Sequence, residues 1–302
     1  MPNRTFDAVD HLLALDPGRR GIAAFFEAGG ARRAAEALAG SRRVVITTGF
    51  LVEPKTAETD GPPGAAVLGR ALRRLGADVT YVSDAETIPV LSAALRAVGE
   101  PPAVRAYGDG PDAAAEIMER AQPTHLIAIE RPARSRSGDY LNMRGQSVAE
   151  WNRPIDEVFV LCNDGATSRS RRGWAGRGGR GSGRPVTIGV GDGGNEVGMG
   201  NVRARLARQS ALMARIAATV TVDHLVVAGV SNWGAYGIVA HLGHRAGQGL
   251  LHTPAEERAM VMACVEAGAY DGVTRRREAT VDALPLDVHA SVVALLGVSW
   301  GP

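Results

Sequence analysis

Short apolar runs alternate along the chain with longer segments whose apolar positions recur at helical spacing. Each run contains few polar positions, so the pattern predicts strands that are buried on both faces, as in a parallel sheet. The predicted strands are RRVVITTGF (42–50), ADVTYVSD (77–84), AVRAYG (103–108), THLIAIE (124–130), PVTIGV (185–190) and DHLVVAGV (223–230).

Helices are predicted between these strands, and a helical lead-in is predicted over residues 1–40. The segments with helical spacing are 65–76, 87–99, 112–122, 202–218, 234–247 and 255–269. The first of them ends at Gly76, a natural residue just beyond a helix end. The alternation predicts an α/β fold, a mostly parallel sheet with helices on both faces in a Rossmann-like three-layer sandwich, within a single domain over residues 1–302.

Polar, glycine-rich loops follow four of the predicted strands, after Ile46, Ile129, Val190 and Val230. Open parallel sheets bind ligands at the carboxyl ends of their strands, where the connections diverge. We therefore expect one binding site, built from these four loops.

The loop VTIGVGDGGNEVGMGN (186–201) contains the pattern Gly189-x-Gly191-x-x-Gly194 of dinucleotide-binding proteins. Two features argue against a dinucleotide. Asp192 and Glu196 lie where a pyrophosphate would bind, and the strand that follows ends without the acidic residue that would bind a ribose. Glycines for helix packing and acids as helix caps are the structural alternative, but caps need only one or two such residues. The loop favours a small-molecule site that includes Asn195, Gly193 and Gly194.

The other loops supply further candidates for substrate binding, namely Asp60, Gly61, Glu130, Arg131, Asn142, Arg144, Ser231 and Asn232. Arginine suits a substrate carboxylate because its planar fork matches two oxygens at once. Each segment also has a purely structural interpretation: a turn around Asp60, a solvated loop around Arg131, and a helix cap at Ser231 or Asn232.

Composition narrows the class of protein. The chain has 302 residues, of which 45% are hydrophobic, enough for a large buried core. No stretch reaches the roughly 18 apolar residues of a membrane span, and the start lacks a secretory signal, so we expect a cytoplasmic protein without a membrane partner. The two cysteines, Cys162 and Cys264, are too few for a disulfide framework and are expected to be buried and inert.

Arginine is concentrated in SRSRRGWAGRGGRGSGR (168–184), within a chain of net charge +2. Such a segment resembles RNA-binding tails, with Trp174 available for stacking, but as a short insertion it is predicted to be a disordered loop, and no nucleic-acid partner is expected. His241 and His244 lie three apart on a predicted helix, and without a third ligand nearby they are interpreted as surface histidines rather than as a metal pair. The sequence leaves open whether the chain forms a homo-oligomer.

Taken together, these motifs resemble the D-glutamate cyclase family. The matching stretches come in family order over nearly the whole chain: DPGRRG (16–21), ITTGF (46–50), ETDGPPGA (58–65), AIERP (128–132), YLNMRG (140–145), GVGDGGNEVGMGNV (189–202), AGVSNWGAYG (228–237), DGVT (271–274) and TVDALP (280–285). Two features depart from the family pattern: the segment 168–184, and Ala283 where glycine is expected.

The resemblance implies conversion of D-glutamate to 5-oxo-D-proline and water. This chemistry needs one carboxylate to take a proton from the ammonium group and one acid to protonate the departing oxygen. Asp192 and Glu196 are the expected pair, with Asp60 or Glu130 as alternatives for either part. Asn195 and loop amides are expected to hold the developing oxyanion, and Arg131 or Arg144 the α-carboxylate.

No cofactor is certain from the sequence. The same acids, Asp60, Asp192 and Glu196, also suit Mg²⁺ or Mn²⁺ acting as a Lewis acid. Two other functions stay open as alternatives: a nucleotide-dependent oxidoreductase that uses the glycine loop, and an amino-acid-binding protein without catalytic activity.

Overall fold

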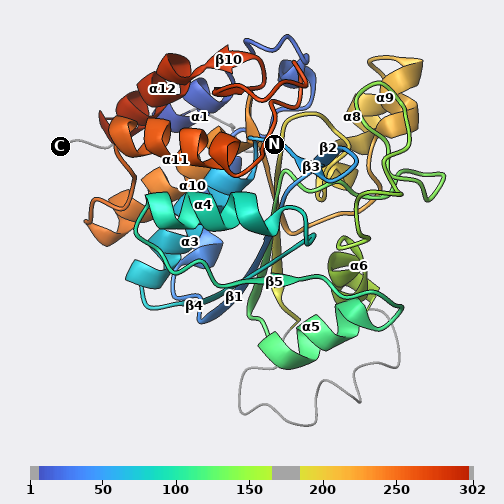
Figure 1. The fold of residues 1–302 in the computed structure, drawn as a ribbon, viewed down its shortest axis with the longest axis horizontal. Helices are drawn as coiled ribbons and strands as arrows, with labels where there is room; N and C mark the ends of the chain where they lie inside the picture. Colours follow the sequence, from blue (N-terminus) through green and yellow to red (C-terminus); the bar gives the residue numbers. More distant parts are fainter. Residues whose placement is uncertain (1–6, 165–183, 299–302) are drawn as a thin grey trace.

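A six-stranded parallel sheet forms the centre of the molecule. The structure is a computed structural model that describes residues 7–164 and 184–298 (Figure 1). The strands of the sheet, in chain order, are β1 (Arg43–Thr48), β4 (Asp78–Ser83), β5 (Val104–Ala106), β6 (His125–Ile129), β7 (Val186–Gly191) and β8 (His224–Val227). Their order across the sheet is β5-β4-β1-β6-β7-β8, so the direction of strand addition reverses between β1 and β6. Ligands bind at such a reversal in open α/β sheets.

Helices cover both faces of this sheet, as the alternation of strands and helices predicts (Figure 1). One face carries α2 (Gly30–Leu38), α3 (Pro62–Arg74), α4 (Ile88–Ala97) and α10 (Ser231–Ala246), and the other carries α5 (Ala113–Ala121) and α6 (Glu157–Asp164). An outer layer of α11 (Pro254–Glu266) and α12 (Leu286–Val298) packs on α4 and α10. The α/β sandwich is therefore confirmed.

Helix α3 shows how packing fixes these layers. It packs between α10 and α4 on one face of the sheet, and its residues from Pro62 to Leu72 are all buried. Among them is Arg70, whose guanidinium reaches Glu256 at the start of α11, 2.9 Å away. A helix covered on both sides in this way has little freedom to shift, so the loop before it is held in place.

Two predicted helices are interrupted. The lead-in contains only α1 (Ala8–Leu13), the short 3-10 helix η1 (Ile22–Ala24) and α2, separated by the loop that holds DPGRRG. The segment 202–218 divides into α8 (Arg203–Ala207) and α9 (Ala211–Ile216) because the Ser210 side chain caps a new helix start by accepting a hydrogen bond from the Met213 amide. Helical spacing does not reveal such a break, since both halves keep the same apolar period.

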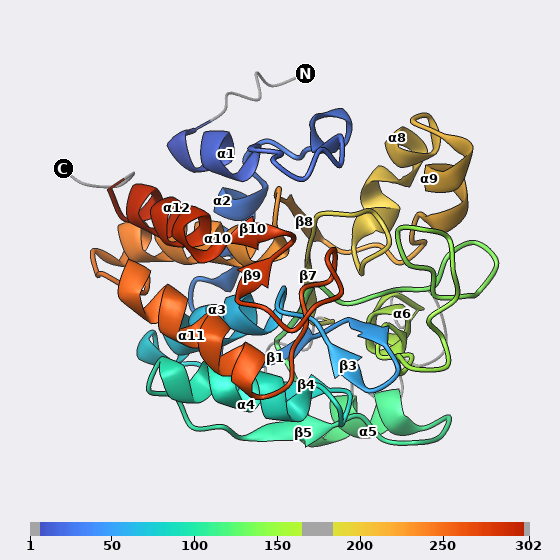
Figure 2. The same cartoon turned by 45° about the horizontal axis from the view of Figure 1, so that its top comes forward.

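Two small hairpins lie side by side near the carboxyl ends of the central strands (Figure 2). They are β2–β3 (Leu51–Glu53 and Thr56–Ala57), within the predicted loop, and β9–β10 (Thr280–Val281 and Leu284–Pro285). The Thr59 hydroxyl, just beyond β3, donates to the Thr280 carbonyl at 2.8 Å. The hairpins thus bring together two segments that are more than 200 residues apart in the sequence, near the carboxyl ends of the strands.

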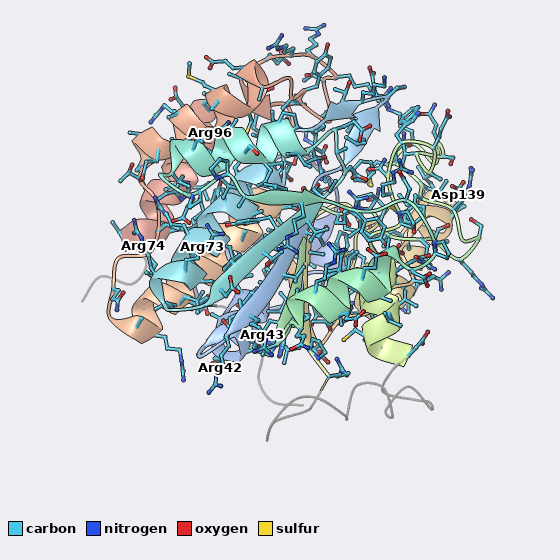
Figure 3. All side chains as sticks on the ribbon, turned by 60° about the horizontal axis from the view of Figure 1, so that its bottom comes forward. Arg42, Arg43, Arg73, Arg74, Arg96 and Asp139 are labelled. Carbon is cyan, nitrogen blue, oxygen red and sulfur yellow. The ribbon has the colours of Figure 1, made fainter. Side chains whose placement is uncertain are left out.

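The other side of the sheet, where the strands begin, is rich in arginine. Figure 3 shows Arg42 and Arg43 at the amino end of β1, Arg73 and Arg74 at the end of α3, and Arg96 at the end of α4. The arginine-glycine segment 168–184, predicted to be a disordered loop, comes between α6 and β7 in the sequence and, apart from Arg184, lies outside the described residues. Within the described ranges, no helix is long and apolar enough to cross a membrane.

Candidate active site

A cavity of about 220 Å³ opens at the carboxyl ends of β1, β6 and β7, where the strand order reverses. Three arginines and five acids contribute to its lining, with apolar side chains near the β2–β3 hairpin. The lining residues are Arg20, Phe50, Val52, Glu58, Glu130, Asn142, Met143, Arg144, Asp192, Asn195, Glu196, Gly272, Val273, Arg275 and Asp282. The loops after Ile46, Ile129 and Val190 therefore meet as the sequence predicts.

Asp60 binds the amino terminus of α10 from behind the cavity. Its two carboxylate oxygens accept the backbone amides of Ser231 and Asn232, each at 2.9 Å. The Asn232 side chain returns the contact by accepting the amides of Gly61 and Gly64. A carboxylate at this position complements the positive end of the helix dipole. The predicted residues Asp60, Gly61, Ser231 and Asn232 thus come together, but as supports of the site rather than as cavity lining.

Glu130 follows β6 and points into the cavity from a strained backbone. Its φ of 45° lies in the left-handed region that residues with a side chain rarely adopt. The Ser231 hydroxyl donates a hydrogen bond to its carboxylate. Backbone strain of this kind persists where the surroundings enforce it, and it is concentrated at functional sites.

Glu196 folds back onto the glycine loop that carries it. Its carboxylate accepts the amides of Gly193 and Gly194, both at 2.7 Å, and more distantly the amide of Asp192 at 3.4 Å. These are the amides that a dinucleotide loop would direct at a pyrophosphate, and they are already taken. The expectation that they hold an oxyanion is corrected for the same reason.

Arg20 is the cation at the centre of the acidic cluster. One guanidinium nitrogen donates to Asp192 and the other to Asp282, so the side chain bridges the glycine loop and the β9–β10 turn. Burial alone would lower the pKa of Arg20, but the charges of Asp192 and Asp282 outweigh burial and raise it well above its ordinary value. The guanidinium therefore stays charged, with five carboxyl groups on the same cavity wall.

Four of the carboxyl groups near Arg20 have a raised pKa and so hold protons more tightly than carboxyl groups in water. Burial raises the pKa of Asp192 well above its ordinary value, although Arg20 opposes the shift. Burial and the neighbouring Glu196 raise the pKa of Glu130, and burial with Glu130 raises that of Glu58. Burial also raises the pKa of Asp60, to about 7. Carboxyls that are protonated near neutral pH can serve as acids, a property typical of active sites.

Two groups of three carboxylates are compact enough to hold a metal ion. Asp60, Asp192 and Asp282 form one group and Glu130, Asp192 and Glu196 the other, with one oxygen of each residue within 4.8 Å of the others. One oxygen of Asp192 and one of Asp282 are buried without a hydrogen-bond partner. Oxygen ligands of this kind suit Mg²⁺ or Mn²⁺.

Arg131 lies outside the cavity lining, in contrast to the sequence expectation. Its side chain is fully buried and donates to Asp84 and to the carbonyls of Gly49 and Arg153. It braces the ends of β1, β4 and β6 instead of facing a ligand. Arg144 does line the cavity and is exposed.

Asn142 and Asn195 also reach the cavity, but their side chains already make hydrogen bonds. The Asn195 amide donates to the Leu141 carbonyl at 2.7 Å, which ties the glycine loop to the YLNMRG segment. The Asn142 oxygen accepts the amides of Arg144 and Gln146 and so shapes that segment. Both residues stabilise the cavity wall.

Sequence reasoning did not select Arg20, Glu58 or Asp282 as site residues. All three lie inside motifs quoted for the family resemblance, DPGRRG, ETDGPPGA and TVDALP. These motifs were the only sequence signal that could have identified the three residues. Sequence spacing cannot pair Arg20 with Asp192, because the two residues are 172 positions apart.

The chain is similar to proteins of a known family. A model of the family described as D-glutamate cyclase-like, C-terminal, matches residues 9–297. The chain is 32% identical over 253 residues to the human protein named D-glutamate cyclase, mitochondrial, an alignment that covers 78% of this chain and 38% of that protein. A solved structure, an exopolyphosphatase-related protein from Bacteroides fragilis, aligns with a TM-score of 0.43 at 8% identity over 92% of this chain and 58% of the other. The family match includes every residue that lines the cavity.

Proposed function

The chain belongs to the D-glutamate cyclase-like C-terminal family, and we propose that it converts D-glutamate to 5-oxo-D-proline and water. The chain spans 38% of the length of its human relative, so the activity in that protein's name comes to this chain as a proposal. The observation that carries it is the cavity in which buried carboxyl groups with raised pKa surround one arginine.

The reaction forms one bond and breaks another. The α-amine of D-glutamate attacks the γ-carboxyl carbon, so a nitrogen–carbon bond forms, and the hydroxyl of the resulting tetrahedral intermediate leaves as water. The ammonium group must lose two protons in all, one before the attack and one from the newly bonded nitrogen, and the departing oxygen of the γ-carboxylate must gain both to leave as water. Acidic walls attract the ammonium group, whereas they would repel a pyrophosphate. A cavity that holds the chain of D-glutamate folded supplies a further large part of the acceleration by proximity.

Asp192 is suited to act as the acid. Its carboxyl is buried with a raised pKa, and one of its oxygens has no hydrogen-bond partner. Glu196 is suited to take the ammonium proton, because its Oε2 accepts only the Gly194 amide and keeps a lone pair. Arg20, beside Asp192, supplies the positive charge that would offset the oxyanion.

A divalent cation is the alternative source of that positive charge. Asp192 with Asp60 and Asp282, or with Glu130 and Glu196, would hold it, and it would polarise the γ-carboxyl group. Dialysis against EDTA separates the two mechanisms. Turnover that survives EDTA supports proton transfer by the carboxyls with Arg20, whereas turnover that is lost and then restored by Mn²⁺ assigns these carboxyls to a metal.

The Asp192→Asn variant tests the acid directly. We expect turnover of D-glutamate to fall by about 100-fold or more, because general acid catalysis contributes 10²–10⁴-fold. Chiral chromatography of D-glutamate and 5-oxo-D-proline measures it. Glu119→Gln, an exposed acid on α5, is the matched control and should keep full turnover. If Asp192→Asn were as active as that control, Asp192 would have no part in the mechanism. If the wild-type chain bound D-glutamate without converting it, the protein would instead be an amino-acid-binding protein.

A further inference from the structure

Two of the family-like motifs, DGVT (271–274) and TVDALP (280–285), have no part in the mechanism above apart from Asp282. They belong to one segment, residues 270–285, that follows α11 and contributes Gly272, Val273, Arg275 and Asp282 to the cavity. We propose, as an inference that rests on the proposed function, that Arg275 binds the α-carboxylate of the substrate and that Asp271 is the positioning residue that holds Arg275 at the cavity.

Asp271 organises this loop from its interior. The carboxylate is fully buried and accepts four hydrogen bonds, from the amides of Val273 and Thr274 at 2.8 Å and from the Thr280 hydroxyl and the Ala283 amide at 2.7 Å. Its own carbonyl accepts the Arg275 amide at 2.9 Å. One side chain therefore joins the DGVT motif to the β9–β10 turn and fixes the backbone of Arg275.

The loop is also docked against the cavity wall. Tyr270 exchanges backbone hydrogen bonds with Ala57 and Thr59, at 3.0 and 2.9 Å, as an added strand would. Gly272 lies so close to Glu58 that a Cβ atom there would be 2.0 Å from its carboxylate oxygen. Arg275 is thus placed relative to the acids by contacts on both sides of the loop.

The Arg275 guanidinium has hydrogen-bonding capacity left for a ligand. Its one ion pair, with Glu53, is 3.7 Å long, and its buried Nε has no hydrogen-bond partner among the described residues. The side chain is 30% exposed, so it can reach a ligand while part of its surroundings stays dry. A charge-assisted, forked contact is strongest in such a setting.

The other arginines at this edge fit the task less well. Arg20 is bonded to Asp192 and Asp282, and Arg131 to Asp84. Arg144 is exposed, which weakens an ionic contact through solvent screening. A dicarboxylate also needs a compensating cation before it can enter a cavity lined by five acids.

The product distinguishes the two carboxylates of the substrate. 5-Oxo-D-proline keeps the α-carboxylate, whereas its γ-carboxyl has become the lactam. We therefore measure binding of 5-oxo-D-proline by titration calorimetry, together with KM and kcat for D-glutamate. In Arg275→Gln we expect both the product Kd and the KM to rise about 10- to 100-fold, with kcat changed less, because a hydrogen bond to a charged group contributes about that factor.

Matched controls make the result specific. Arg276→Gln changes the exposed neighbour, which lies outside the cavity lining, and should leave Kd and KM unchanged. Arg275→Lys keeps the charge without the fork and should give intermediate values. The neutral lactam 2-pyrrolidinone lacks the carboxylate, so its affinity should be equal in the wild-type chain and in Arg275→Gln. Asp271→Asn should raise KM in the same direction, and the further change Arg275→Gln should then add little, which a general loss of folding would not reproduce.

Three outcomes would overturn the assignment. An unchanged product Kd with a raised KM would assign Arg275 to the γ-carboxylate, and no change in either would remove it from substrate binding. A wild-type chain that binds no 5-oxo-D-proline would have no such carboxylate site. Since binding is measured without turnover, a chain that binds the product but leaves D-glutamate unchanged would instead contradict the proposed function.

Discussion

At the residue scale, Arg20 is the group on which the acidic cluster depends. Arg20→Gln should lower the free energy of unfolding by about 3–5 kcal/mol at pH 8, because it leaves Asp192 and Asp282 as uncompensated buried charges. The loss should be smaller at pH 6 than at pH 8, since the raised pKa of Asp192 favours proton uptake by its carboxylate as the pH falls. Denaturant unfolding at the two pH values measures both effects, with Arg19→Gln as the exposed neighbouring control. An equal loss at both pH values would indicate a packing role instead.

Because of Asp60, we expect the free energy of unfolding to increase as the pH falls. Its folded pKa of about 7 lies above the ordinary 3.8, so the native state binds a proton that the unfolded chain releases. The penalty for ionised Asp60 is complete above pH 7 and is relieved as the pH falls toward 4. The free energy of unfolding of the wild-type chain, relative to Asp60→Asn, should therefore increase from pH 8 to pH 5. Parallel pH profiles for the two proteins would contradict this assignment.

At the scale of elements, the glycine loop requires close contact between its own two ends. A Cβ atom at Gly189 in β7 would lie 2.4 Å from the Val197 carbonyl oxygen, and the backbone cannot yield as a flexible side chain would. Gly189→Ala should therefore cost about 1–3 kcal/mol in the free energy of unfolding and lower turnover, because the shift reaches Asp192 and Glu196. Gly249→Ala, with open space around its Cβ, is the control. Equal thermal stabilities for Gly189→Ala and Gly249→Ala would contradict the requirement for this close contact.

The elements themselves were largely predictable from the sequence, because burial on both faces leaves continuous apolar runs such as Val44–Val45–Ile46. The break at Ser210 was missed, since a local cap overrides helical spacing. The fold also placed the glycine loop and Glu130 at one cavity, as expected. Arg20, Asp282 and Arg275 escaped prediction because they reach the site from opposite ends of the chain, where only tertiary contacts bring them together. Ala283 has a φ of 62°, which explains physically why glycine was expected there.

At the scale of the whole molecule, the two edges of the sheet are distinct in chemistry. The cavity lies at the carboxyl ends of the strands, whereas β7, which follows the arginine-glycine segment in the sequence, begins at their amino ends. Replacing residues 168–183 with a glycine-serine linker of equal length should therefore leave KM and kcat for D-glutamate unchanged. If the segment served RNA, the same variant would lose a salt-sensitive affinity for RNA, measured by fluorescence anisotropy at two salt concentrations. A large loss of turnover would instead connect that edge to catalysis.

The proposal that this chain closes the ring of D-glutamate is tested most directly at the carbon atom that reacts. Carbon-13 NMR of D-glutamate labelled at C5, incubated with the purified chain, observes the reacting atom directly. We expect the carboxylate signal to disappear and the lactam signal of 5-oxoproline to replace it, with no change for labelled L-glutamate. A spectrum in which the carboxylate signals of both enantiomers persist would contradict the claim.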